Sequence, residues 1–497
     1  MKTLLIVLDT VRRDYLECYG SPWVKTPSIS RLASEGIVFD NHWVGSLPCM
    51  PARRELMTGR YNFLDRMWGP IEPFDDILPI ELRKRGVFAH LLTDHFHYFE
   101  LGGGGYHSSF STWDFFRGQE HDPWVSVVDA PALPPFTLCA TAQNQLNRSR
   151  QQQEVDFSGP RTVQSAMDWL DTNRAADNWF LQVELFDPHE PFYCTQEYRD
   201  LYGDTWDGPL GDWPPYQKVA ESPEILEHIR KCYAGLLTMT DHWVGKLLDK
   251  MSDLALLNET LIIFTTDHGT MLGEHAYWMK GHMPCYNEIS QIPLVVRLPG
   301  GEQGGTRESR LTQTIDIMPT ILQHHGCALP PNVQGIPLRD TLGGRSQRKD
   351  VIFGYFGMAT NITDGKHVYF RNPVTAENGP LFAYTAMPTS GINAWTPRNL
   401  FDRIEAGRYL GHTYNLPVYK IPASRALPAS HPHEGPAVDR HELFDIVVDP
   451  MQNAPFADPE VERHLCERIA DHLTAVGAPA EQFARIGLEA PVVVGAE

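Results

Sequence analysis

The sequence predicts a layered α/β protein with a large, mostly parallel sheet sandwiched by helices, followed by a smaller C-terminal α+β unit. Short runs of β-branched and aliphatic residues alternate with stretches of helical periodicity, which is typical of parallel strands joined by crossover helices. Near residue 351 the pattern changes to closely spaced strand-like pieces followed by one helix. These two observations define the expected fold class.

The elements of the first part are short and regularly spaced. Its candidate strands are Thr3–Leu8, Val87–Leu92, Trp179–Leu185, Leu261–Thr265 and Ile292–Arg297. Helical patterns lie between them, among them Ser28–Glu35, Arg161–Asn173 and Ile225–Met251. The segment Gly102–Gly159 has a glycine run, many aromatic residues and little periodicity, so we expect a long surface excursion of the kind that often binds ligands.

The second part contains the candidate strands Val351–Phe356, His367–Phe370 and Leu443–Val448 and a candidate helix at Asp458–Val476. A chain of 497 residues exceeds one small domain, so we expect a catalytic α/β domain at 1–350 and a smaller α+β domain at 351–497.

The composition bounds the function. The chain has 42% hydrophobic and 21% charged residues, as in an ordinary globular protein. Its net charge of -20 argues against a nucleic-acid partner, which requires a basic surface. An anionic substrate would therefore need local positive charge from a metal ion or from a few Arg and Lys side chains.

The N-terminal apolar run is short, ends at Asp9 and lacks a small-residue cleavage site, so it predicts a buried strand and not a signal peptide. No apolar stretch of the sequence approaches the length that spans a bilayer, and no membrane partner is expected. The 8 cysteines are scattered without a CxxC pair, which fits reduced thiols. We therefore expect a cytoplasmic protein.

Four candidate strands are followed at once by metal-capable or titratable residues, namely Asp9, Asp94–His97, Asp187–His189 and Asp267–Gly269. In open α/β sheets ligands bind outside the carboxyl ends of the strands, so these clusters are expected to face one crevice. Asp9, Asp267 and His268 could hold a divalent cation together with one or two further oxygens. The alternatives are Asp residues that cap helices or form turns, and a turn in which Gly269 takes a positive φ.

The sharpest signal surrounds Cys49. Pro51 suits the first turn of a helix, so Cys49 is expected at a helix N-terminus, where backbone N–H groups stabilise an anion. Arg53 lies one turn onward and can reach back to the same site. A buried structural Cys is the alternative. The thiolate loop of tyrosine phosphatases is excluded because it has the spacing C-x5-R, and Glu55 occupies the required position.

These motifs resemble the sulfatase family of the alkaline phosphatase superfamily. The family signature C-x-P-x-R followed by T-G-R is matched by Cys49, Pro51, Arg53 and Thr58-Gly59-Arg60. Supporting matches span most of the chain: Asp9, Cys18-Tyr19-Gly20, Thr26-Pro27, Leu32-Ala33, His189-x-Pro191, Thr266-Asp267-His268-Gly269, Lys280, Glu442-Leu443-Phe444-Asp445 and Asp449-Pro450.

The resemblance implies an alkaline-phosphatase-like fold whose C-terminal domain carries an antiparallel sheet. It implies that a formylglycine-generating enzyme oxidises Cys49 to formylglycine, whose hydrated aldehyde attacks a sulfate ester. One divalent ion, with calcium expected and manganese as the alternative, is implied to bind Asp9, Thr10, Cys49, Asp267 and His268.

The resemblance also implies roles for other residues. Arg53 steadies the hydrated aldehyde, and Lys280 and His189 bind the transferring oxyanion, with His189 able to protonate the leaving group. His97 corresponds to the base near the formylglycine, and His95 falls in substrate binding where many sulfatases have a Lys.

Two departures from the family pattern leave the substrate open. Thr10 stands where many members have a second Asp, and His268 stands where many arylsulfatases have Asn, as in phosphonate monoester hydrolases. The first hypothesis is a sulfatase acting on a sugar or aryl sulfate ester, and the second is a phosphonate monoester or phosphodiester hydrolase with the same nucleophile. A third is a binding protein on an inactive hydrolase scaffold. The sequence does not fix the oligomeric state, and a homo-oligomer stays open.

Overall fold

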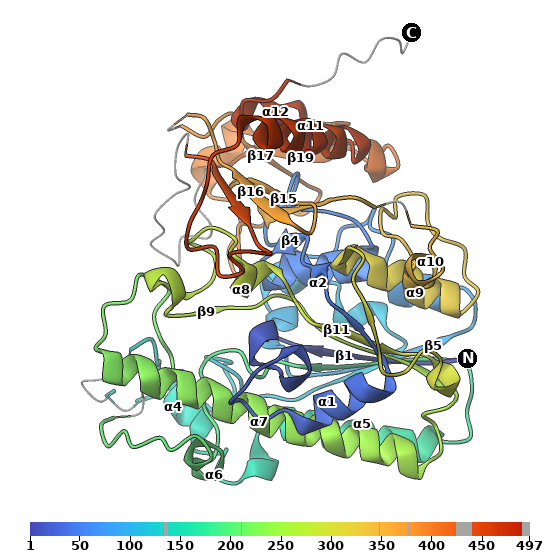
Figure 1. Ribbon diagram of the computed structural model, residues 1–497, viewed down its shortest axis with the longest axis vertical. Helices are drawn as coiled ribbons and strands as arrows, with labels where there is room; N and C mark the ends of the chain where they lie inside the picture. Colours follow the sequence, from blue (N-terminus) through green and yellow to red (C-terminus); the bar gives the residue numbers. More distant parts are fainter. Residues whose placement is uncertain are drawn as a thin grey trace.

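The computed structural model describes residues 1–130, 132–133, 138–209, 211–346, 348–375, 377–423 and 440–489. A large eight-stranded sheet forms its centre (Figure 1). In order across the sheet the strands are β12 (Thr306–Glu308), β2 (Ile37–Phe39), β11 (Leu294–Arg297), β8 (Thr260–Thr266), β1 (Lys2–Leu8), β7 (Trp179–Leu185), β5 (Phe88–Thr93) and β6 (Thr112–Phe115).

The sheet is mostly parallel, which confirms the predicted fold class. β1 runs parallel to both β7 and β8, and β5 runs parallel to β7 and β6. Among the described strands of this sheet, β11 alone runs against its neighbours β8 and β2. The sheet is therefore mixed, as predicted, although the sequence did not indicate which strand runs antiparallel, because a buried apolar run carries no information about strand direction.

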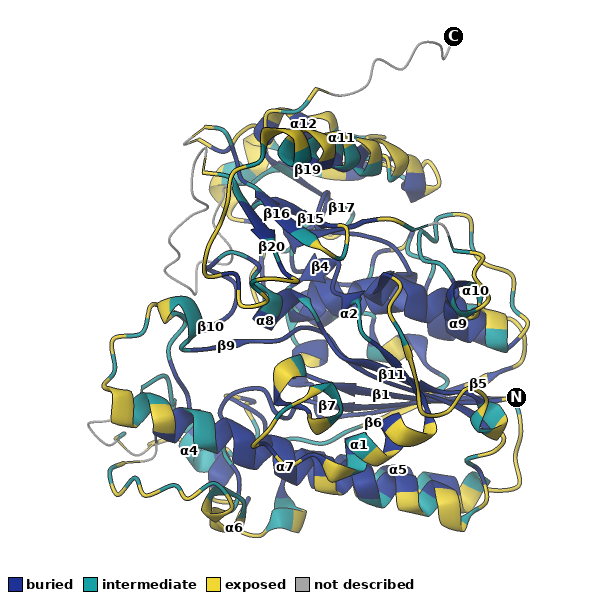
Figure 2. Ribbon diagram, viewed as in Figure 1, coloured by how far each residue is buried: buried dark blue, intermediate teal, exposed yellow. Residues whose placement is uncertain are grey.

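Helices cover both faces of the sheet, as Figure 1 shows. Side chains alternate along β1, so that Leu4, Ile6 and Leu8 pack toward one helical layer and Leu5 and Val7 toward the other. The first layer contains α1 (Pro27–Glu35), α5 (Ser158–Asn173) and α7 (Pro223–Asp253). The second contains α2 (Cys49–Thr58), α3 (Leu78–Arg83) and α9 (Ile317–His324). The strands between the layers are buried (Figure 2).

A second sheet lies above α2 and contains mainly antiparallel strands from the C-terminal part. Its order is β20 (Glu442–Asp445), β16 (His367–Arg371), β15 (Thr360–Thr363), β14 (Val351–Tyr355) and β4 (Ser46–Leu47). Helices α11 (Pro459–Ala475) and α12 (Ala480–Arg485) pack on it. The short strand β4 comes from the first part of the chain, so the division at residue 350 stays a prediction. A small sheet of β17 (Phe382–Thr385), β19 (Val418–Pro422) and β18 (Glu405–Gly407) completes this region.

Two expected elements differ from those observed. The candidate strand Leu443–Val448 ends at Asp445, and Val447 and Val448 are exposed in the following turn. The segment Gly102–Gly159 is not one irregular excursion, because it contributes the edge strand β6 and the helix α4 (Ala142–Arg148). Within it, residues 131 and 134–137 lie outside the described residues. Helices of the described part are all too short or too polar to cross a bilayer.

Candidate active site

The carboxyl ends of adjacent strands bring distant parts of the sequence together. β8, β1, β7 and β5 are neighbours in that order. Leu8 pairs in register with Leu185 on one side and Thr266 on the other, so Asp9 and Asp267 emerge at the same level of the sheet. The crevice expected from the sequence therefore lies at this edge.

Cys49 is the first residue of α2, as predicted, and its buried sulfur lies 3.1 Å from Nε2 of His268. Burial, and then the negative charge of Asp9, raises the pKa of the unmodified thiol well above its usual value. Without a bound cation the thiol therefore stays protonated at neutral pH and is a weak nucleophile.

Four buried side chains around this point offer ligands to a metal ion. Oxygen, sulfur and nitrogen atoms of Asp9, Cys49, Asp267 and His268 all lie within 4.8 Å of one another. Nδ1 of His268 lies 2.8 Å from the carbonyl oxygen of Gly269, which assigns the proton to Nδ1 and leaves Nε2 to face the cluster. Burial lowers the pKa of His268, which favours the neutral imidazole that a metal requires. Two carboxylates and an imidazole fit a divalent cation.

The alternative turn at Gly269 is not observed. Gly269 does not adopt a positive φ. Glycine is needed here for close packing instead, because an added Cβ would lie 1.9 Å from the carbonyl oxygen of Glu288. The segment after β8 is therefore pressed against the backbone of α8 (Asn287–Ser290), which fixes the position of Asp267 and His268.

Arg53 lies among the same acids. Its guanidinium donates hydrogen bonds from Nη2 to Asp9 Oδ2 (2.8 Å), from Nη1 to Asp267 Oδ2 (2.6 Å) and from Nε to Glu184 Oε1 (2.5 Å). Nη1 also lies 3.3 Å from the carbonyl oxygen of Cys49. Burial alone would raise the pKa of Asp9, but Arg53 and the other nearby cations outweigh it and hold that pKa below its usual range. The arginine therefore reaches residue 49, as expected, but pairs mainly with the acids.

Thr10 has an unusual backbone conformation for a β-branched residue, with a φ of 62°. Its backbone N–H donates a hydrogen bond to Asp267 Oδ1 at 3.0 Å, and its hydroxyl donates to Asp9 Oδ1. The residue therefore links the two acids directly, and its oxygen lies beside the donor cluster.

Lys280 follows β10 (Trp278–Met279) and is buried beside His189. Its Nζ lies 2.8 Å from His189 Nε2, 3.4 Å from Glu190 Oε2 and 3.4 Å from Thr10 Oγ1. Nδ1 of His189 lies 2.7 Å from the carbonyl oxygen of Glu190, so Nδ1 carries the proton and Nε2 accepts from the lysine. Burial would lower the pKa of Lys280, but Glu190 and the other nearby acids outweigh it, so the ammonium stays charged.

The two histidines after β5 are both buried and pack against each other. His95 is fully buried, with Nδ1 3.8 Å from Asp9 Oδ2, and neither ring nitrogen has a hydrogen-bond partner among the described residues. Burial, followed by Arg53, lowers its pKa well below the usual value. The ring centroid of His97 lies 5.2 Å from that of His95, and Nδ1 of His97 lies 2.5 Å from Glu100 Oε2.

Sequence reasoning missed several residues of the site. Glu184 carried a usable signal, because a charged residue inside the buried run Trp179–Leu185 is rare without a partner. Glu190 sits inside the His-x-Pro element, and Tyr216 donates a hydrogen bond to its carboxylate. Glu120 lies in the loop after β6, 3.3 Å from His189 Nδ1, and its sequence context gave no indication of this position.

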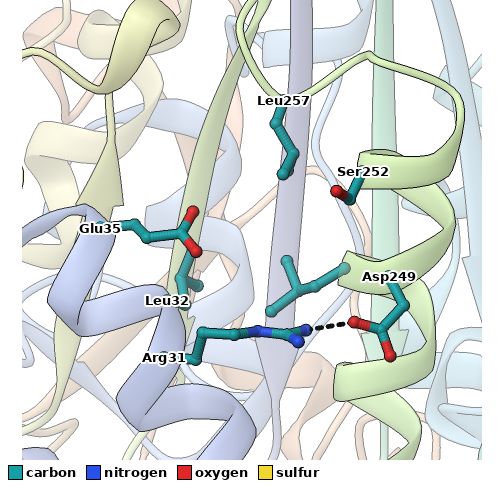
Figure 3. A pocket seen from close by; sticks show the side chains of 7 residues that line it. Arg31, Leu32, Glu35, Asp249, Ser252 and Leu257 are labelled. Carbon is teal, nitrogen blue, oxygen red and sulfur yellow. Dashed lines mark ion pairs between the residues drawn. The ribbon is translucent and has the colours of Figure 1, made fainter.

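A separate cavity lies between α1 and α7 (Figure 3). Arg31 and Asp249, which line it, form an ion pair at 2.7 Å. The cavity is on the helical layer opposite α2 and therefore does not belong to the site around Cys49.

Comparison with known proteins identifies the family. The sulfatase family profile matches residues 2–327. The chain belongs to the sulfatase family. Similar proteins include an arylsulfatase of Clostridium perfringens, 24% identical over 393 residues that cover 71% of this chain and 80% of that protein. A choline-sulfatase of Rhizobium meliloti is 25% identical over 444 residues, covering 80% of this chain and 83% of that protein.

The fold of this sulfatase also matches solved structures. A phosphonate monoester hydrolase of Agrobacterium radiobacter superimposes with a TM-score of 0.64 at 20% identity and covers 96% of this chain and 95% of that chain. Family membership makes the protein a sulfuric ester hydrolase. It also implies a divalent metal and a formylglycine nucleophile, for which the cluster around Cys49 has suitable donors.

Proposed function

We propose that this sulfatase hydrolyses the sulfate ester of a small alcohol, aryl alcohol or sugar, with residue 49 as the nucleophile after oxidation of Cys49 to formylglycine. The observation that carries the proposal is the position of Cys49 at the start of α2, 3.1 Å from His268 and within the reach of two buried carboxylates. Maturation would require a formylglycine-generating enzyme. A cytoplasmic location stays a prediction.

Asp9, Asp267, His268 and residue 49 would hold the divalent ion, and the hydroxyl of Thr10 is a further candidate donor. When bound, the ion supplies Lewis-acid activation of the nucleophile and of the sulfate oxygens. The carboxylates favour calcium, and the imidazole of His268 is equally suited to manganese.

The remaining residues of the site would provide positive charge and a proton donor. Lys280 stays charged and, with His189, would bind the sulfate oxygens in which negative charge develops. The lysine ammonium donates a hydrogen bond to Nε2 of His189, and His189 would be the group that protonates the leaving oxygen. Arg53 would hold residue 49 and its acids in place, with His95 beside Asp9 and His97 packed against His95.

Mass spectrometry of the tryptic peptide that contains residue 49, with metal analysis of the same sample, tests this proposal. The expected result is the mass loss from thiol to aldehyde, together with about one equivalent of divalent metal. The protein should be co-expressed with a formylglycine-generating enzyme, because a host that lacks this enzyme would leave Cys49 unmodified whatever the function of the protein. An unmodified Cys49 and no metal under those conditions would favour the inactive-scaffold hypothesis.

A phosphonate monoester or phosphodiester hydrolase is the second candidate function. Thr10 gives the donor set less negative charge than a second Asp would, and a neutral residue at this position together with His268 resembles the pattern of phosphonate monoester hydrolases, which favours this alternative. Kinetics on matched aryl sulfate and phenylphosphonate esters separate the two. If kcat/KM for every sulfate falls orders of magnitude below that for the phosphorus ester, the second function is correct.

A further inference from the structure

Glu120 occupies a strained and firmly held position beside the proposed active site. Its φ is 40°, in the left-handed region that residues other than glycine rarely adopt. Asn144 donates a hydrogen bond to its carbonyl oxygen at 2.7 Å. The preceding Gln119 donates from Nε2 to Asp94 Oδ2 (2.9 Å) and to Asp187 Oδ1 (3.0 Å). The loop is therefore fixed in a conformation that directs the Glu120 side chain toward His189.

No lysine or arginine of the described residues forms an ion pair with the carboxylate of Glu120, which meets imidazole rings instead. Glu120 is 6% exposed, and no hydrogen bond to its carboxylate is found among the described residues. Nδ1 of His189 and Nδ1 of His121 lie 3.3 and 3.4 Å from the carboxylate, and Nε2 of His97 lies 4.0 Å from it. Burial lowers the pKa of His189 and of His121, which favours the neutral form of these two rings. Neighbouring Glu190, in contrast, is paired with Lys280. Burial, and then the charge of Glu190, raises the pKa of Glu120 well above its usual value.

The surroundings suit an organic cation better than a metal ion. Nδ1 of His189, the imidazole atom nearest Glu120, already donates its hydrogen to the carbonyl oxygen of Glu190 and so is not a metal ligand. Aromatic rings pack on two of the imidazoles that Glu120 contacts: the ring centroid of Phe96 lies 5.2 Å from that of His121, and the centroid of Phe186 lies 4.2 Å from that of His189. Aromatic faces beside a buried acid stabilise ammonium groups.

We propose that Glu120 recognises a positively charged group on the leaving alcohol, so that the preferred substrates are sulfate esters of amino alcohols or amino sugars. The inference rests on the proposed sulfatase function. His189 separates the two charges that such a zwitterionic ester would meet, with Lys280 at Nε2 for the sulfate and Glu120 at Nδ1 for the ammonium group. A bound ammonium would also remove the cost of the unpaired buried acid.

Two esters of the same shape test the proposal, because choline sulfate and 3,3-dimethylbutyl sulfate differ in the charge of the terminal group. For the modified, metal-loaded enzyme we expect kcat/KM to be about 10–100-fold higher for choline sulfate. Glu120→Gln keeps the shape and the hydrogen-bond acceptor but loses the charge, and should bring the ratio of the two esters to about 1. The surface variant Glu197→Gln should keep the wild-type ratio.

The result that overturns the proposal is a wild-type ratio near 1, or an equal loss on both esters in Glu120→Gln. Retention of the preference in Glu120→Gln would also overturn it, because recognition would then depend on hydrogen bonding and not on charge. Glu120→Asp keeps the charge and should retain part of the preference if the Gln variant does not fold. Hydrolysis of the neutral ester reports separately on the proposed function, since an enzyme that cleaves no sulfate fails both.

Discussion

Arg53 and Glu184 form a buried ion pair, with 2.5 Å between Nε and Oε1. The phenol of Tyr98 donates a hydrogen bond to the other oxygen of Glu184 at 2.8 Å, so the carboxylate is fixed on both sides. This pairing turns the two Nη atoms of Arg53 toward Asp9 and Asp267. Glu184 is thus a positioning residue that sets the orientation of the guanidinium within the metal-donor cluster.

Glu184→Gln should disturb this orientation without removing volume. We expect kcat to fall about 10–100-fold, as for other residues that orient metal-site groups, with a smaller change in KM. The unfolding free energy should fall by about 1–3 kcal/mol, because a charge-assisted hydrogen bond is weakened in a buried place. Steady-state kinetics and urea denaturation measure both effects. The control Glu259→Gln breaks a peripheral ion pair with Lys2, and stability should change by about 1 kcal/mol or less. An unchanged kcat in Glu184→Gln would show that Arg53 needs no such support.

Removal of the metal should inactivate the enzyme without unfolding it. Arg53 pairs with Asp9 and Asp267, so these acids are not left uncompensated when no ion is bound. Chelation should therefore abolish turnover reversibly and lower the unfolding free energy by about 2.7 kcal/mol relative to enzyme at 100 times the metal Kd. Thermal denaturation with and without added calcium or manganese measures the shift.

Asp267→Asn should reduce metal content and activity together, because it removes one of the two carboxylates of the cluster. Metal analysis after dialysis and the rate of sulfate release are the two measurements. Asp249→Asn is the matched control, since it breaks the exposed ion pair with Arg31 and should alter stability by about 1 kcal/mol or less. Full metal content in Asp267→Asn would place the ion elsewhere.

Thr10 offers a way to separate charge from backbone strain. Asn and Asp tolerate its positive φ better than a β-branched residue, so both Thr10→Asn and Thr10→Asp should relieve strain. Only Thr10→Asp adds a negative charge beside Asp9, and it should bind calcium about tenfold more tightly or better. Titration calorimetry of the metal-free variants tests this. Equal affinities in the two variants would mean that the side chain at position 10 does not contact the ion.

The sequence predicted those parts of the fold that depend on apolar patterning. β1 and β7 were found to within a residue, because their runs of buried aliphatic residues end sharply. The edge strand β6 was missed since Thr112 and Trp113 are exposed and show no such pattern. The direction of β11 was missed because direction depends on the path of the connecting chain, which patterning does not encode.

In the candidate site, residues at strand ends could be predicted from the sequence, and residues contributed by distant loops could not. Asp9, Asp267 and His268 could be placed together because each follows a strand, and adjacent parallel strands end at one edge. Glu120 could not, because it reaches His189 from a loop whose course depends on tertiary contacts such as the hydrogen bond from Asn144. Local sequence predicts which side chains follow a strand, but it does not predict which distant loop packs against them.

A buried pair of acids should make the stability of the protein depend on pH. Asp94 and Asp187 share the side-chain amide of Gln119, and the loops that follow them carry His95 and His189. Burial, and then the charge of Asp94, raises the pKa of Asp187 to about 8. A carboxyl whose pKa is raised on folding contributes most at low pH, and this contribution is lost as pH rises from the ordinary value of 3.8 through about 8.

Asp187→Asn should remove this dependence, because the amide stays neutral and its oxygen can still accept the hydrogen bond from Gln119. Relative to wild type, the unfolding free energy of the variant should rise between pH 5 and pH 9 by at least about 1.4 kcal/mol, which corresponds to one pKa unit. Urea denaturation at pH 5, 7 and 9 measures the difference, with Asp253→Asn as a surface control that should run parallel to wild type. If the unfolding free energies of Asp187→Asn and wild type change with pH in the same way, Asp94 and Asp187 are both ionised throughout this range. Gln119 would then hold the two loops that carry His95 and His189 together against a constant electrostatic repulsion.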